Sequence, residues 1–139
     1  MITGHDIYSY LNLRSTEDCF GVYVGVQEIN EEYAPTKVGR SKNALAIQRG
    51  RAQGGANWWF CAYFQLPTNE DTHLVERAWK QQFKSKHIKH TTQRQTELYS
   101  LSPTDAVDHL EALVQSMGYE INDLVDEILE DHLNEALIL

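Results

Sequence analysis

The sequence has few cysteines and prolines and no long hydrophobic run. Three prolines and eight glycines in 139 residues exclude a collagenous chain, and a hydrophobic content of 42% excludes a wholly disordered one. No apolar stretch approaches the ~18 residues of a membrane-spanning helix, and residues 1–10 lack the features of a signal peptide. Cys19 and Cys61 lie in apolar surroundings without metal-ligand spacing. We therefore expect two small core residues in a cytoplasmic protein with no membrane partner.

Positive charge is missing from the end of the chain. Residues 102–139 carry 10 of the 20 acidic residues and no Lys or Arg, whereas residues 1–101 carry all 12 Lys and Arg. The net charge of -8 therefore originates in the C-terminal segment. Residues 37–94 hold 11 basic residues against three acidic ones. This balance makes a polyanion such as nucleic acid a candidate partner, with an ordinary solvated surface as the alternative.

Hydrophobic patterning predicts an α+β core followed by two helices. Strands are predicted where β-branched and aromatic residues gather: 19–29, 36–40, 58–66 and, as a last edge strand, 97–101. The strand at 58–66 is apolar on both alternating faces, which predicts a central strand. Helices are predicted at 44–53, 69–83, 103–117 and 121–137, with 6–14 of uncertain type and 84–96 a loop. Asn69 or Asp71 can cap the second of these helices, and Ser102 the third.

A hairpin of the first two predicted strands would place a phenol and an ammonium side by side. Alternate residues of a strand share one face, so antiparallel pairing of GVYVG with KVGRS puts Tyr23 and Lys37 on the same face. An ordinary cross-strand pair is the plain alternative. Gly39 is either a turn residue or a point where the backbone comes close to a substrate.

Two further candidates lie on predicted helices. Arg49 and Arg51 are separated by about 200° around a helix, so only one of them can face the strand pair. Glu76 lies at the margin of a buried helical stripe, where a carboxylate needs a partner. That partner is either Lys80 one turn later or a metal ion that also binds several waters.

Taken together, these segments resemble the GIY-YIG nuclease superfamily. GVYVG corresponds to the first half of the family motif and KVGRS to the second, and a helix with Arg49, an aromatic strand and a helix containing HLVERAW follow. The resemblance covers residues 20–101 and implies a small core whose three-stranded, mainly antiparallel sheet is flanked by helices. Residues 1–19 are then an N-terminal extension, and residues 102–139 an acidic helical C-terminal extension.

The resemblance implies a metal-dependent endonuclease that hydrolyses DNA phosphodiester bonds. Tyr23 would take a proton from the attacking water, Lys37 would favour the ionised phenol, and Arg49 would face the phosphate oxygens. Glu76 would hold one Mg²⁺ or Mn²⁺. Substrate contacts are also expected at Gly39, Arg40, Arg51, Lys84, Lys86 and Lys89. The sequence departs from the family pattern where Lys37 replaces a second tyrosine, as in one branch, and where Glu97 occupies the region of a late polar residue.

The acidic C-terminal segment leaves other functions open. Seven large aliphatic residues between Ile121 and Leu137 form a stripe at helical spacing, which must pack against the core, the preceding helix or a second copy of the chain. The acids would then form a negative ridge that either keeps the domain soluble or competes with DNA. The alternatives to a nuclease are therefore a non-cutting nucleic-acid-binding or regulatory protein on the same fold, and an interaction module. A homodimer through the C-terminal helices is compatible with each of them.

Overall fold

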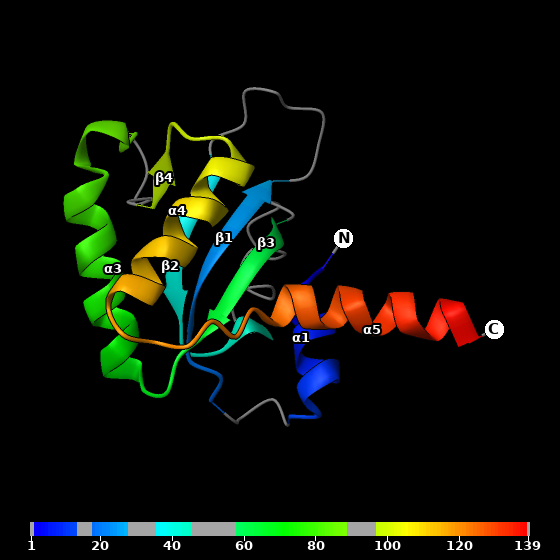
Figure 1. The fold of residues 1–139 in the computed structure, drawn as a ribbon. Helices are drawn as coiled ribbons and strands as arrows, with labels where there is room; N and C mark the ends of the chain where they lie inside the picture. The colour runs from blue at the N-terminus through cyan, green and yellow to red at the C-terminus, as the bar shows by residue number, and fades with distance from the viewer. Residues whose placement is uncertain (1, 14–17, 28–35, 46–57, 89–96, 139) are drawn as a thin grey trace.

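The computed structural model describes residues 2–13, 18–27, 36–45, 58–88 and 97–138. These residues form a sheet with helices on both faces (Figure 1). In chain order the elements are α1 (Gly4–Leu11), β1 (Gly21–Gln27), β2 (Thr36–Ser41), β3 (Trp58–Gln65), α3 (Asn69–Gln82), the 3-10 helix η1 (Lys84–Lys86), β4 (Leu98–Tyr99), α4 (Pro103–Ser116) and α5 (Leu124–Ile138). None of the helices in these ranges combines the length and apolar character needed to cross a bilayer.

The sheet has four antiparallel strands in the order β3-β1-β2-β4. The α+β class is thus confirmed, and β1 and β2 pair as the predicted hairpin, with Tyr23 opposite Gly39 and Gly25 opposite Lys37. Among the described residues the sheet has one strand more than the three that the resemblance implies, and the additional strand is the edge strand predicted at 97–101. The two residues of β4 extend the sheet beyond β2, where Leu98 pairs with Lys37.

β3 is an edge strand rather than the predicted central one. It is nevertheless covered on both faces, because Ala62 and Phe64 join the core beneath α4, whereas Tyr63 joins the core beside α5. Its outer edge is partly closed by isolated bridges from Ile2 and Asp123. The apolar residues on both faces of β3 therefore reflect burial by helices on both sides, and not a central position in the sheet.

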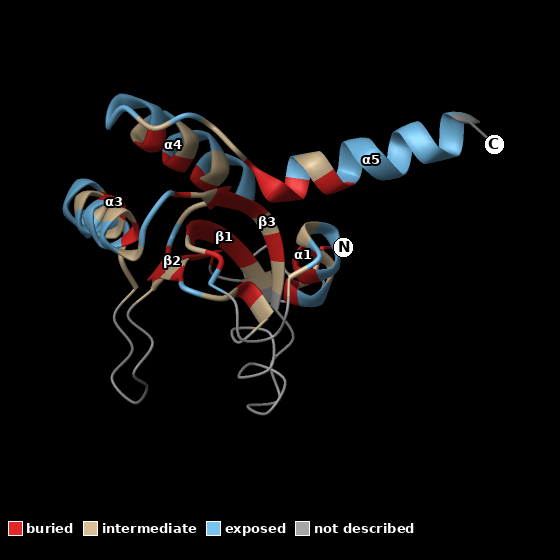
Figure 2. Cartoon of the chain, turned by 90° about the horizontal axis from the view of Figure 1, so that it is seen from below, coloured by how far each residue is buried: buried red, intermediate tan, exposed pale blue. Residues whose placement is uncertain are grey.

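Two hydrophobic cores lie on opposite faces of the sheet, and β1 contributes to both. Val22 and Val24 join the core of α3 and α4, whereas Tyr23 joins the core of α1 and α5. Figure 2 shows β1 largely buried between these helices. Cys19 is buried in the second core, Cys61 packs beside the first, and both are free thiols. This placement agrees with the prediction of two small core residues.

The starts of α3 and α4 follow from local hydrogen bonds. The Thr68 hydroxyl accepts from the Asp71 N–H at 3.1 Å, and the Asp71 carboxylate accepts from the Thr68 N–H at 3.1 Å. Thr68 is therefore the N-cap, and the prediction of Asn69 or Asp71 as the cap was wrong, since both lie in the first turn. Ser102 caps α4 as predicted, with Pro103 at its first position.

The segment after α3 is more regular than the predicted loop. Residues Lys84–Lys86 form η1, and the N–H of Ile88 donates to the carbonyl of Leu98 at 2.9 Å. Its remainder, residues 89–96, lies outside the described residues, as does most of the helix predicted at 44–53.

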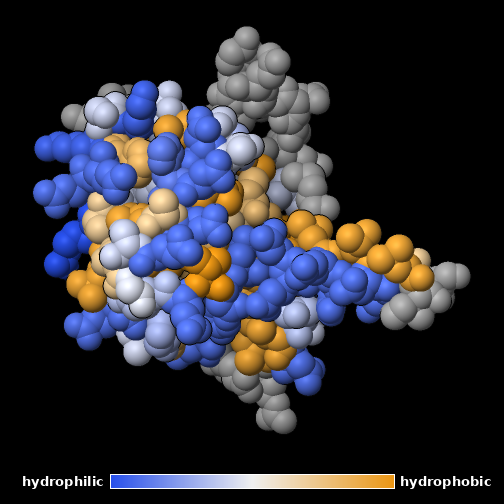
Figure 3. Space-filling model, viewed as in Figure 1, coloured by the Kyte–Doolittle hydropathy of each residue, from blue (hydrophilic) through white to orange (hydrophobic). Residues whose placement is uncertain are grey.

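α5 is buried at its base and exposed along the rest of its length. Leu124, Val125 and Ile128 are at most 3% exposed, whereas exposure rises to 51% at Leu129, 62% at Leu133 and 76% at Leu137. The helix leaves the body of the molecule, and an apolar strip runs along it (Figures 1 and 3). Within the described part of the chain, the predicted stripe is therefore covered over only about half of its length.

Candidate active site

Three polar side chains meet on one face of the β1–β2 hairpin. The Tyr23 hydroxyl donates a hydrogen bond to Glu97 Oε2 at 3.2 Å, and Lys37 Nζ lies 3.3 Å from the same oxygen. Lys37 Nζ also lies 5.9 Å from the centre of the Tyr23 ring. The strand register produces this cluster, because Tyr23 and Lys37 occupy diagonal positions on neighbouring strands and Glu97 immediately precedes β4. We call these three residues the tyrosine cluster.

The tyrosine cluster is largely shielded from solvent. Tyr23 is 2% exposed and the Lys37 side chain 3%, whereas the Glu97 side chain is 26% exposed. A buried ammonium is costly without a negative partner, so the Glu97 carboxylate stabilises Lys37 in its charged form. The Tyr23 ring is fixed by an edge contact with Phe60 and a parallel contact with Tyr63, at centroid distances of 5.2 and 6.4 Å. These contacts hold the phenol with its hydroxyl toward Glu97.

Gly39 allows the cluster to assemble. A Cβ atom at this position would lie 2.5 Å from Glu97 Oε2 and 3.0 Å from the Tyr23 hydroxyl oxygen. Gly39 lies within β2 and not in a turn, and the group that comes close to it belongs to the protein itself, so its approach to a substrate stays a prediction. The neighbour is the Glu97 carboxylate.

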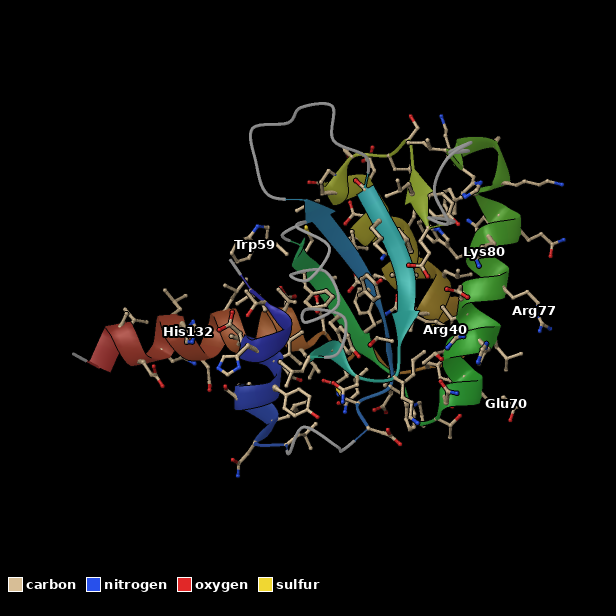
Figure 4. All side chains as sticks on the ribbon, turned by 180° about the vertical axis from the view of Figure 1, so that it is seen from behind. Arg40, Trp59, Glu70, Arg77, Lys80 and His132 are labelled. Carbon is tan, nitrogen blue, oxygen red and sulfur yellow. The ribbon has the colours of Figure 1, made fainter. Side chains whose placement is uncertain are left out.

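Glu76 belongs to a second ionic group, which we call the glutamate cluster. Its Oε1 lies 3.4 Å from Arg40 Nε and 3.5 Å from Lys80 Nζ, and the Glu76 side chain is 14% exposed. Figure 4 shows Arg40 in the region between β2 and α3. Lys80 therefore pairs with Glu76 as the plain alternative predicted, and Arg40 adds a second cation from the motif strand.

The two clusters lie on opposite sides of β2, but the carboxylates of both affect the pKa of one residue, Tyr99. Gly39 and Arg40 are consecutive, so they point to opposite faces of the strand. Tyr99 is 1% exposed, and its burial together with the carboxylates of Glu76 and Glu97 raises its pKa to about 12. Both carboxylates thus lie close enough to Tyr99 to disfavour its ionised form.

The remaining predicted site residues are placed less fully. Lys84 and Lys86 are exposed on η1, at the end of α3. Arg49, Arg51 and Lys89 lie outside the described residues, so the choice between the two arginines stays open. The role of Glu97 in the cluster was not predicted. Its only sequence signal was the acidic residue before the Leu98–Tyr99 strand, and the pairing of that strand with β2 brings its carboxylate over Gly39.

Glu76 is a single carboxylate, and its Oε1 already has two cationic neighbours, Arg40 and Lys80. Within the described ranges, no group of three or more His, Cys, Asp and Glu side chains is placed to hold a metal ion. A single carboxylate suits Mg²⁺, which takes its other ligands from waters and phosphate oxygens, whereas a two-metal site needs several acids.

A scan against protein-family models found no match to the chain, and searches of curated proteins and of solved structures likewise found none. The resemblance to the GIY-YIG superfamily therefore stays a prediction. It depends on the motif residues and on the sheet positions described above.

Proposed function

We propose that this protein is a metal-dependent endonuclease that hydrolyses DNA phosphodiester bonds. The observation that carries the proposal is the convergence of the Tyr23 hydroxyl and Lys37 Nζ on Glu97 Oε2, at 3.2 and 3.3 Å, in the hairpin formed by the two motif segments. A phenol between an ammonium and a carboxylate is equipped to accept one proton while it gives up another.

In this mechanism the proton of the Tyr23 hydroxyl moves along its hydrogen bond to Glu97. The Tyr23 hydroxyl oxygen takes a proton from the attacking water while its own proton passes to Glu97 Oε2. The phenol then does not have to carry a full negative charge, which a group with an ordinary pKa of about 10 resists at neutral pH. Lys37 Nζ lies 3.3 Å from Glu97 Oε2 and 5.9 Å from the centre of the Tyr23 ring, so its positive charge would favour the ionised phenol.

The glutamate cluster lies on the other side of β2 from the Tyr23 hydroxyl, and it carries charges that a phosphate of the substrate could use. Arg40 and Lys80 are cations on the margin of the core, suited to the non-bridging oxygens. Glu76 is the residue that would hold one Mg²⁺ or Mn²⁺, and the ion when bound would supply Lewis-acid polarisation of the phosphate and of the leaving oxygen. Arg40 thereby joins Arg49 and Arg51 as a candidate for the arginine that neutralises the transition state.

Nicking of supercoiled plasmid in the presence and absence of Mg²⁺ tests the proposal. Tyr23→Phe keeps the ring contacts and removes the hydroxyl, so it should fold normally and lose about 100-fold or more of the rate. Glu76→Gln should also lose most cleavage. Lys42→Ala is a matched control, because Lys42 is 64% exposed and pairs with Asp18 away from both clusters. Wild-type rates in both Tyr23→Phe and Glu76→Gln contradict the mechanism.

One observation favours the second candidate, a nucleic-acid-binding or regulatory protein that does not cut. Glu76 Oε1 already has two cationic neighbours, Arg40 and Lys80, which compete with a metal ion for that oxygen. On this alternative, wild-type protein shifts DNA in a gel without nicking it in Mg²⁺ or Mn²⁺. Replacement of Lys84, Lys86 and Lys89 by alanine should flatten the salt dependence of binding in either case.

For the exposed stripe of α5, the partner that we propose is a second copy of the chain. Leu129, Leu133 and Leu137 follow one another at four-residue spacing on a helix that leaves the body, so two antiparallel copies of α5 could cover each other. α5 has acidic residues and no Lys or Arg. Such a homodimer would therefore be weakened by repulsion at low salt and strengthened by screening.

A further inference from the structure

A second functional feature is a pocket of about 530 Å³ beside the glutamate cluster. It lies between α3, η1 and β4. The residues that line it are Arg77, Lys80, Gln81, Lys84, His87 and Tyr99. Lys80 belongs both to this pocket and to the glutamate cluster, whereas the described lining includes no residue of β1, β2 or the tyrosine cluster.

Cations surround the pocket. Arg77, Lys80 and Lys84 follow one another at spacings of three and four, which places them on one side of α3 and its continuation, and Figure 4 shows the first two along that helix. Lys80 pairs with Glu76, but no acid of the described chain lies within 4.0 Å of Arg77 or Lys84. Among the described residues that line the pocket, none is acidic. The rim is therefore suited to an anion.

The interior of the pocket is mainly apolar, and two rings form part of its wall. The ring of His87 lies 5.4 Å from that of Tyr99 at an angle of 58°, and Tyr99 in turn contacts Trp79 edge-on at 5.6 Å. His87 is half-buried and Tyr99 is buried, so the imidazole is the ring that a ligand can reach. Apolar walls with a cationic rim suit a ligand that has a flat aromatic body and a phosphate.

The volume of the pocket can be compared with that of a nucleotide, which has both an aromatic base and a phosphate. Pockets of roughly 300–1,000 Å³ hold a single small molecule, so the volume of this pocket admits one nucleotide. A base can enter only when it is out of the helical stack, as in a single strand or at an unpaired site. Lys80, which lines the pocket, has its Nζ 3.5 Å from Glu76 Oε1. The phosphate next to a nucleotide bound in the pocket would therefore come close to the glutamate cluster.

We propose that the pocket binds one nucleotide of an unpaired DNA strand, with its phosphate at Arg77 and Lys84 and its base against His87. This inference deepens the proposed function and rests on it, because it assigns the endonuclease a substrate with an unpaired segment next to the cleaved bond. A solvated helix face would show the same cations but no preference between strands.

Binding without divalent metal tests this inference separately from cleavage. The probes are fluorescent oligothymidylate and a duplex of the same length, titrated with full-length Tyr23→Phe protein and followed by anisotropy. Single-stranded DNA should bind more tightly than duplex. Arg77→Ala and Lys84→Ala should each reduce the slope of log Kd against log salt for the single strand by about 0.7, the contribution of one phosphate. Lys42→Ala removes one exposed cation elsewhere and should leave affinity within about twofold.

His87→Ala separates base binding from simple phosphate attraction. Loss of one stacking contact should weaken single-strand binding about fivefold or more and leave duplex binding unchanged. Equal losses for both probes, or variants at Arg77 and Lys84 that behave like Lys42→Ala, overturn the pocket assignment. If oligothymidylate binds as expected while the wild-type protein never nicks DNA, the pocket stands and the proposed nuclease activity fails.

Discussion

The ion pair of Lys37 with Glu97 should be costly to break, and by an amount that depends on which partner is removed. The Lys37 side chain is 3% exposed and that of Glu97 26%, with 3.3 Å between the charged atoms. Breaking a fully buried pair costs about 3–5 kcal/mol, and partial exposure of Glu97 lowers this. We expect Glu97→Gln to lose about 2–3 kcal/mol, because Lys37 cannot reach water. Lys37→Met should lose only about 1–2 kcal/mol, since the remaining carboxylate can be hydrated.

The double variant isolates the interaction itself. Lys37→Met combined with Glu97→Gln should be less destabilised than the two single losses predict, with a coupling of about 1–3 kcal/mol. Urea unfolding followed by tryptophan fluorescence measures all four proteins, and an unchanged m-value shows that the comparison is valid. The pair of Lys42 with Asp18 is the matched control, because it spans 3.7 Å with side chains 64% and 46% exposed. Its cycle should give less than about 0.5 kcal/mol.

A coupling below about 0.5 kcal/mol for Lys37 and Glu97 would refute this reasoning. So would a Glu97→Gln variant as stable as the wild type, because the structure gives Lys37 little access to solvent. Either result would also remove the geometric support for proton transfer from Tyr23 to Glu97.

Four further outcomes are expected. Asp123→Ala should lose about 2–4 kcal/mol, since Asp123 Oδ1 accepts from the buried Tyr63 N–H at 2.9 Å at the start of α5, whereas Asp123→Asn keeps this acceptor. Burial raises the pKa of Asp123, so stability should fall as pH rises through that pKa in the wild type but not in Asp123→Asn, as urea unfolding across pH can measure. Leu133→Glu should abolish self-association, and wild-type association should increase with salt in sedimentation velocity; a wild-type monomer at every salt concentration contradicts the dimer. Truncation after Leu101 should give an unfolded product by circular dichroism, because Leu110 of α4 is 1% exposed in the core, and a folded product would contradict this.

Local periodicity was enough to predict the hairpin and its shared face. The alternation of residues in GVYVG and KVGRS placed Tyr23 with Lys37, since strand geometry leaves few other registers once Val22 and Val24 face a core. The position of Ser102 at the start of α4 followed equally from cap chemistry. These features depend on residues close in sequence, where propensity and hydrogen bonding decide the outcome.

Long-range pairing explains what the sequence did not predict. Glu97 follows β2 by more than fifty residues, and its position over Gly39 depends on the pairing of β4 with β2. The edge position of β3 could not be predicted, because α4 and α5 bury its two faces as fully as those of a central strand. Similarly, the apolar stripe of α5 showed which residues avoid water but not that those beyond Ile128 are exposed in the single chain.

α5 packs against the rest of the described chain near its N-terminal end, so a movement at that end is amplified along the helix. Its 15 residues span about 22 Å, so a small rotation at the base becomes a displacement of several ångströms at the tip. Asp123, directly before α5, forms a β-bridge with Phe64 of β3, and its carboxylate accepts a hydrogen bond from the Tyr63 N–H. The Tyr63 ring lies parallel to that of Tyr23, within 9°. The base of α5 is therefore only two contacts away from the ring that holds the proposed catalytic hydroxyl.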